Sequence, residues 1–122
     1  MEKEEIDKYR ESFLSRLKQQ QLSNKKRQTQ ALFDLEKIKK YLIEEVGVKE
    51  IYLFGSIISD TFNQTSDIDL AVSGVKDEDF LKVYSKLDDF TSFNIELIDL
   101  DEKDDFLRQQ IRKRGKKIYE RG

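Results

Sequence analysis

The first 46 residues of the chain carry apolar side chains at helical intervals and contain no glycine or proline. Apolar residues three or four positions apart mark one face of an amphipathic helix. The first such stripe consists of Ile6, Tyr9, Phe13 and Leu17. A second stripe consists of Leu32, Leu35, Ile38, Leu42 and Val46. Gly47 follows at a position where helices commonly end, so the pattern predicts helix over most of this segment.

The stretch between the two stripes, "KQQQLSNKKRQTQ" (18–30), is polar and has only Leu22 to bury. It is either a hinge near Ser23 and Asn24 or the exposed middle of one long helix, and the pattern fits both. The first stripe also has two interpretations. It packs into a core or against another helix, or it forms an arm that contacts a partner protein.

After Gly47 the pattern changes to short apolar runs typical of strands, separated by helical segments. The runs predict strands at 50–54, 67–72 and 93–100, with helices at 77–90 and 104–115. We expect Phe80, Leu81, Tyr84 and Leu87 to point inward from the first of these helices, and Phe106, Leu107 and Ile111 from the second. The order of elements predicts an α+β fold, with a small mixed sheet of about three to four strands flanked by helices. We assign residues 1–28 to an N-terminal helical extension and residues 29–122 to the domain.

Composition narrows the functional classes. The chain has 122 residues, 39% of them charged, and a net charge of only -2, which offers no overall field for attracting nucleic acid. It has no cysteine and no histidine, which excludes a disulfide framework and a Cys/His zinc site. No apolar run approaches the roughly 18 residues that a membrane span needs. We therefore expect a cytoplasmic protein without membrane or direct nucleic-acid contacts.

Two aspartates stand one residue apart in "SDIDLAV", inside a predicted strand. Alternate residues of a strand share a face, so Asp67 and Asp69 project together while Ile68, Leu70 and Val72 face a core. Carboxylates are costly to bury unless a cation balances them. Paired carboxylates on a rigid strand are typical ligands of Mg²⁺, which prefers oxygen and keeps positions open for phosphate.

A phosphate-binding loop is predicted directly after the first strand. Gly55 lets the backbone approach a ligand closely, and exposed N–H groups together with the Ser56 hydroxyl can hold a phosphate. With the aspartates, this loop describes a site for a metal-bound nucleoside triphosphate. A third carboxylate is expected on the next strand. Glu96 is favoured because it lies inside that strand between apolar residues, and Asp99 near the strand's end is the alternative.

These motifs resemble a known family. Gly55-Ser56, ten intervening residues, and then Asp67-Ile68-Asp69 is the spacing of the nucleotidyltransferase superfamily related to DNA polymerase β. The segment from about residue 31 to 120 resembles a minimal nucleotidyltransferase (MNT) domain, because "IYLFGS", "SDIDLAV", "IELIDLDE" and "IRKRGKKIYE" match family blocks in order. The resemblance implies the nucleotidyltransferase fold.

The resemblance also implies a function. Family members transfer a nucleotidyl group, usually AMP from ATP, with Mg²⁺, and two ions are expected. Many MNT proteins are antitoxins that adenylylate a tyrosine of a HEPN-domain ribonuclease toxin, so the expected partners are ATP and such a toxin, in a homo- or hetero-oligomer. Carried over, Gly55 and Ser56 would bind phosphate, Asp67, Asp69 and Glu96 would bind metal, and Glu96 would be the general base. The alternatives are transfer to a small molecule such as an aminoglycoside, and inhibition of the toxin by binding alone.

The sequence departs from the family just after Gly-Ser. Many members have an arginine and a glycine there, whereas this chain has Ile57 and Ile58, which cannot bind phosphate through a charge. A basic residue near the C-terminus would then supply the missing contact. The candidates are Arg112, Lys113, Arg114, Lys116 and Lys117.

Overall fold

The structure is a computed structural model, and it describes residues 3–122. The first two residues of the predicted N-terminal extension lie outside the described part. The helices are α1 (Lys3–Tyr41), α2 (Asp77–Leu87) and α3 (Asp105–Arg114). The strands are β1 (Glu50–Phe54), β2 (Ile68–Ser73), β3 (Ile95–Asp99) and β4 (Lys116–Glu120). The ends of the predicted elements differ from these by three residues at most.

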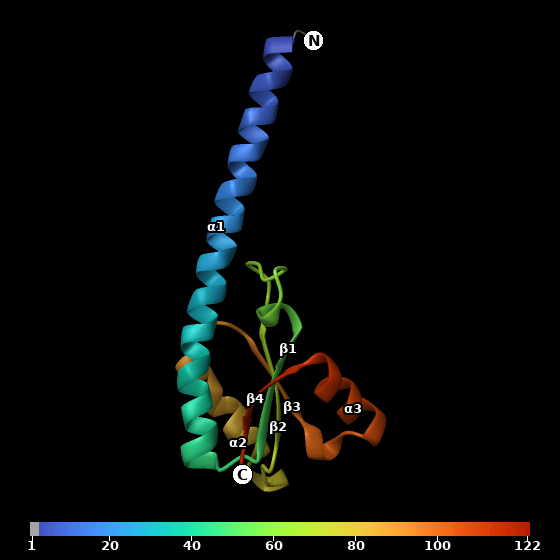
Figure 1. The fold of residues 1–122 in the computed structure, drawn as a ribbon. Helices are drawn as coiled ribbons and strands as arrows, with labels where there is room; N and C mark the ends of the chain where they lie inside the picture. The colour runs from blue at the N-terminus through green and yellow to red at the C-terminus, as the bar shows by residue number, and fades with distance from the viewer. Residues whose placement is uncertain (1–2) are drawn as a thin grey trace.

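The N-terminal segment is one continuous helix of 39 residues, so the interpretation as a long helix without a hinge is correct. Its last turn widens into a π-helical turn over Leu42–Val46. Gly47 then ends it with φ of 78° and donates its N–H to the Leu42 carbonyl at 3.0 Å. The N-terminal part of α1 projects well beyond the rest of the molecule (Figure 1). The predicted boundary between residues 28 and 29 falls within α1 and stays a prediction.

The four strands form one mixed sheet in the order β3-β2-β1-β4. β1 is antiparallel to both β2 and β4, whereas β2 and β3 are parallel. The predicted fold class is therefore confirmed, but the predicted order of elements did not include β4. Its sequence, "KKIYE", has charged ends and only two partly buried apolar residues, which is typical of a short edge strand.

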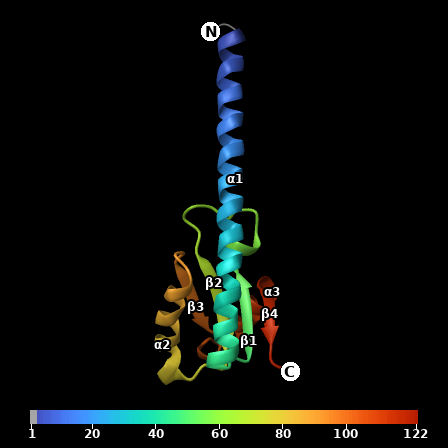
Figure 2. The same cartoon turned by 90° about the vertical axis from the view of Figure 1, so that its left-hand side faces the viewer.

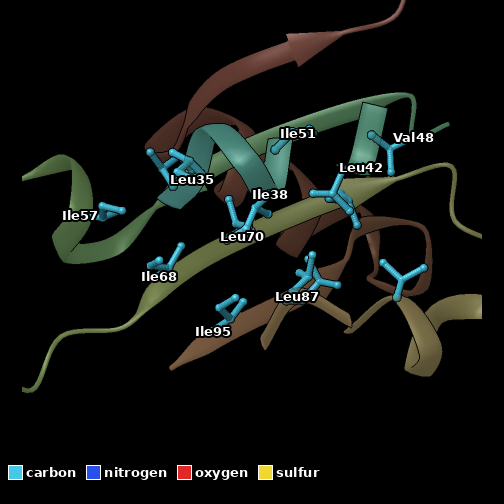
Figure 3. Close-up of a cluster of buried hydrophobic side chains, with 14 of the residues drawn as sticks. Leu35, Ile38, Leu42, Val48, Ile51, Ile57, Ile68, Leu70, Leu87 and Ile95 are labelled. Atoms are coloured by element: carbon cyan, nitrogen blue, oxygen red, sulfur yellow. The ribbon is translucent and has the colours of Figure 1, made fainter. Parts of the chain in front are cut away.

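The helices cover the two faces of the sheet unequally. α1 and α2 lie on one side and α3 on the other (Figures 1 and 2). The main core lies between α1, α2 and the sheet, where Ile38 and Leu42 of α1 meet Leu70 of β2 (Figure 3). All three side chains are fully buried. This core holds β2 rigidly and leaves its opposite face for the site.

Several side chains predicted to be buried are exposed. The first apolar stripe does not enter the core, because α1 extends past the domain there: Phe13 is 57% exposed and Tyr9 66%. Leu32, Leu81, Phe106 and Leu107 also face solvent. Ala31 and Val83 are buried instead. None of the helices within residues 3–122 is long and apolar enough to span a membrane.

Candidate functional site

The acids lie on the sheet face that α3 leaves partly open. Asp69 of β2 is opposite Phe54 of β1 on one side and Glu96 of β3 on the other. The next row of the same face, Tyr52, Ala71 and Ile98, packs with Ile111 of α3. The row that holds Asp69 and Glu96 thus lies just beyond the part covered by α3. Glu96 is exposed and Asp69 is half-buried.

The alternation predicted for β2 is present. Ile68, Leu70 and Val72 are fully buried on the α1 side. Asp67, directly before β2, is half-buried, and its charge acts on Asp69. The structure thus brings Asp67, Asp69 and Glu96 together at one end of the sheet.

Gly55 connects the predicted phosphate loop to the acids. Its φ of +77° lies in the region that favours glycine. A Cβ built on Gly55 would lie 2.2 Å from Oδ2 of Asp69, a distance that no real contact allows. The backbone at Gly55 therefore passes directly against the Asp69 carboxylate, and only glycine fits there.

The turn after Gly55 is held from two sides. Gly55–Ile58 forms a 3-10 turn, with Ser56 half-buried and Ile57 only 2% exposed. The side-chain amide of Gln28 in α1 donates to the carbonyls of Ile57, at 2.8 Å, and Ser59, at 2.9 Å. Ile57 thus anchors the turn in the core. The role of Gln28 could not be predicted from the sequence, because nothing distinguishes it from the other glutamines of its polar stretch.

Replacing Gln28 with alanine is expected to loosen the phosphate loop. Two partly buried carbonyls lose their donor, at about 1 kcal/mol each, and the Michaelis constant for the nucleoside triphosphate that the sequence predicts should rise severalfold because a looser loop binds phosphate less well. Steady-state kinetics and thermal melting measure both effects. Gln19→Ala is the matched control, since Gln19 is an exposed glutamine of the same helix. Equal effects of the two substitutions would contradict the role of Gln28.

The negative charges of the three acids at the site repel one another. The pKa of Asp69 is raised from 3.8 to about 6, first because the carboxyl is partly buried, and then because Glu96 and Asp67 are negatively charged. A hydrogen bond between the Asp69 and Glu96 carboxyls adds to the shift. None of the ion pairs found within residues 3–122 involves these three acids. The acids thus lie close together without a protein cation to balance them.

Removing the Asp69 charge is therefore expected to stabilise the metal-free protein. The folded chain holds the Asp69 proton more tightly than the unfolded chain, so the stability contributed by this group is complete below pH 3.8 and is lost as the pH rises through about 6. Asp69→Asn should raise the melting temperature by a few degrees at pH 8 and change it little at pH 4. Thermal melts without metal at both values measure this, with the exposed Asp88→Asn as control. A lower melting temperature at pH 8 would contradict it.

The comparisons with known proteins place this geometry in a family. The sequence profile described as "Polymerase beta, Nucleotidyltransferase" matches residues 36–122. The chain belongs to the polymerase β nucleotidyltransferase family. The predicted resemblance is confirmed, and the matched segment includes the Gly-Ser turn and all three acids.

Solved structures are similar to this nucleotidyltransferase over nearly three quarters of its length. A chain of the MntA–HepT toxin–antitoxin complex is 26% identical, with a TM-score of 0.57, covering 74% of this chain and 73% of that one. A chain of a toxin–antitoxin structure with AMP-PNP is 27% identical, with a TM-score of 0.58 and 72% of both chains covered. A chain from a complex of tri-AMPylated Shewanella oneidensis HEPN toxin with MNT antitoxin is 26% identical, with a TM-score of 0.57 and coverages of 74% and 72%. No curated protein matches.

The two candidates for the third carboxylate lie apart in this nucleotidyltransferase. Asp99 is opposite Val72, three positions along β3 from Glu96 and on the other face of the sheet. It is buried, which raises its pKa, and it accepts the N–H of Asp101 at 3.0 Å. Asp99 thus ends the strand, whereas Glu96 lies beside Asp69.

A second acidic group also occurs. Within residues 3–122, the three acids with ligand oxygens all within 4.8 Å of one another are Asp77, Asp99 and Glu102. Asp67, Asp69 and Glu96 do not all bring ligand oxygens within that distance of one another.

The basic candidates near the C-terminus differ in position. Arg112 forms an ion pair with Glu50 at 3.0 Å, at the end of β1 far from Gly55. Lys117 is opposite Tyr52, on the sheet face that carries Asp69, and its Nζ lies 5.8 Å from the Tyr52 ring centroid. Of these two, Lys117 is the better placed for a nucleotide at the acids.

Proposed function

We propose that this nucleotidyltransferase transfers AMP from ATP to a hydroxyl of a protein, a tyrosine of a cognate HEPN ribonuclease toxin, and so acts as the antitoxin of a pair. One observation carries the proposal: the Gly55 backbone lies directly against the Asp69 carboxylate. A phosphate held at the Gly-Ser turn would therefore be adjacent to the acids. This arrangement would serve nucleotidyl transfer, because Asp67, Asp69 and Glu96 would hold a metal that neutralises charge on the triphosphate.

The donor set fits magnesium. Carboxylate oxygens that are close together and unpaired with a protein cation are the ligands that Mg²⁺ prefers. Asp67, Asp69 and Glu96 would hold the metal, and two ions are expected from the family. When bound, Mg²⁺ would neutralise charge on the triphosphate and orient its α-phosphate.

Residues of the chain itself would bind the phosphates and accept the proton. The backbone N–H groups of the turn and the Ser56 hydroxyl hold phosphate oxygens. Glu96 accepts the proton of the acceptor hydroxyl, whose oxygen forms a bond to the α-phosphorus of ATP. The bond from that phosphorus to the β-phosphate oxygen breaks, and pyrophosphate leaves. The acceptor becomes an AMP ester, and the proton stays on Glu96 until it passes to water.

The space beside Glu96 supports a protein acceptor. Glu96 lines an open cavity of about 630 Å³ between β3 and α2, which also includes the apolar side chains of Phe80, Leu81 and Tyr84. Asp77, Asp99 and Glu102 also line this cavity, which Glu96 borders at the edge of β3. The similarity to a chain from a complex of tri-AMPylated HEPN toxin with MNT antitoxin supports a toxin of this kind as the acceptor.

The test is to incubate the protein with ATP labelled at the α-phosphate, Mg²⁺ and a purified HEPN partner. We expect label on the toxin, located on tyrosine by mass spectrometry, and loss of its ribonuclease activity. Label on a small hydroxylated compound such as an aminoglycoside, and on no protein, would favour the small-molecule alternative. Inhibition of the toxin without label would favour the binding alternative.

A further inference from the structure

The N-terminal part of α1 has an apolar face that nothing in the molecule covers. We call residues 3–20 the arm. Its exposed apolar side chains are Ile6, Tyr9, Phe13, Leu14 and Leu17, and Phe13 alone is 57% exposed. Isolated helices gain most of their stability from packing such a face, and a contiguous exposed apolar face marks an interaction site.

The exposed stripe lies on the face of α1 that farther along packs on the domain. Ile6 lies 36 residues before Leu42, which is ten helical turns, and Phe13 lies 18 residues before Ala31, which is five. Leu42 and Ala31 are fully buried. The same face is therefore covered by the domain in its second half and bare in its first. A covering element would have to approach from the domain side of the helix.

We propose that the arm pairs antiparallel with the arm of a second copy of this chain. Placing Ile6 opposite Leu17 of the second copy makes an apolar layer that occurs twice by symmetry, and it sets Phe13 level with Arg10 of the second copy and next to Tyr9. Lys3 then lies opposite Gln20. The overlap covers about 27 Å of helix.

The loop after β1 limits how far a second arm can extend along α1. The loop after β1 reaches α1 just beyond the overlap, where Gln28 donates to the Ile57 and Ser59 carbonyls and Arg27 to the Gln64 side chain. Gln21 and Asn24 line the hollow of about 260 Å³ between α1 and this loop. A second arm that reaches to Gln20 stops before this loop.

A parallel pair does not fit. If two arms met face to face in parallel, the second halves of both helices would also face each other. Each of those faces is already covered by its own domain. The two domains would have to occupy the same space, whereas an antiparallel pair places them at opposite ends.

Charge favours the same arrangement. Residues 3–11 contain four acids and three bases, and residues 12–20 contain Arg16 and Lys18 without an acid. Glu5 and Arg16 are eleven residues apart, about three turns, so they border the stripe on the same side. In an antiparallel pair, the residues that flank the stripe on one side lie next to the residues that flank it on the same side in the other copy. Glu5 of each copy therefore comes within about a turn of Arg16 of the other.

The first test is the mass in solution, measured by light scattering at micromolar concentrations without nucleotide. We expect two chains of 14.5 kDa each. Phe13→Glu should weaken self-association about a hundredfold or more. Leu22→Glu is the matched control, because Leu22 is exposed but lies nine residues from Phe13, two and a half turns away, on the opposite face. Its mass should equal that of the wild type.

The second test determines direction and pairing. The chain has no cysteine, so an Ile6→Cys variant mixed with a Leu17→Cys variant should form a disulfide-linked dimer, and Ile6→Cys alone should not. Glu5→Arg and Arg16→Glu should each weaken the dimer severalfold, and the two together should restore it.

A monomer at these concentrations would overturn the proposal, as would cross-linking of Ile6→Cys with itself. If the chain is monomeric and Phe13→Glu instead abolishes binding to a HEPN partner, the stripe belongs to that partner. Self-association is measured without ATP or toxin, so its failure would leave the proposed transfer reaction untouched.

Discussion

Replacing both Asp67 and Asp69 with asparagine is expected to abolish nucleotidyl transfer, lowering the rate about 10³-fold or more. Asp69 lies on β2 and Asp67 directly before it, and Asp69 is in contact with the Gly55 backbone. Asparagine keeps the shape of the side chain but removes the charge that would hold Mg²⁺. The rate is measured as label transferred from α-labelled ATP to the acceptor. Because the Asp69 charge destabilises the fold near neutral pH, the inactive variant should fold at least as well as the wild type.

The control is Asp88→Asn with Asp89→Asn, which changes the net charge equally at two exposed positions after α2. This variant should retain full activity. The double variant at the site should also lose any rise in melting temperature that Mg²⁺ gives the wild type. Retention of more than about a tenth of the wild-type rate by the site variant would contradict the assignment of these residues.

The position of Asp69 on the face of β2 opposite the core was predictable because strand alternation is a local rule. Ile68 and Leu70 are apolar and their neighbours are acidic, so one face of β2 had to be buried and the other had to carry the carboxylates. The strand at 50–54 was equally predictable, because its apolar run ends at a glycine. Which acid of β3 lies beside Asp69 depends on strand register, and only the parallel pairing of β2 with β3 places Glu96 there.

Features that depend on contacts between distant segments were not predictable. The contact of Gln28 with the phosphate turn joins residues 29 and 31 positions apart. The exposure of Phe13 and Tyr9 follows from where the domain ends along α1, which helical periodicity does not encode. The same stripe is consistent with burial and with a free face. β4 was missed because an edge strand needs few apolar residues.

Gly55→Ala is expected to inactivate the enzyme while Gly47→Ala does not. Both glycines have positive φ, +77° and +78°, so alanine at either position costs roughly 1–2 kcal/mol in backbone conformation. They differ in surroundings. A Cβ at Gly47 meets nothing within 4 Å, whereas a Cβ at Gly55 would lie 2.2 Å from Oδ2 of Asp69. The carboxylate or the turn must move, and a displacement of about 1 Å can cost 10²-fold in rate.

Comparing the two variants therefore isolates the contact between the phosphate turn and the acid. Thermal melting should show both destabilised, Gly55→Ala by more. Initial rates of AMP transfer should be near wild type for Gly47→Ala and at least about a hundredfold lower for Gly55→Ala. Gly55→Ala combined with Asp69→Ala should recover stability relative to Gly55→Ala, because removing the carboxyl gives the new methyl group room. Equal rates for the two single variants would mean that the approach of Gly55 to Asp69 does not position the reacting groups.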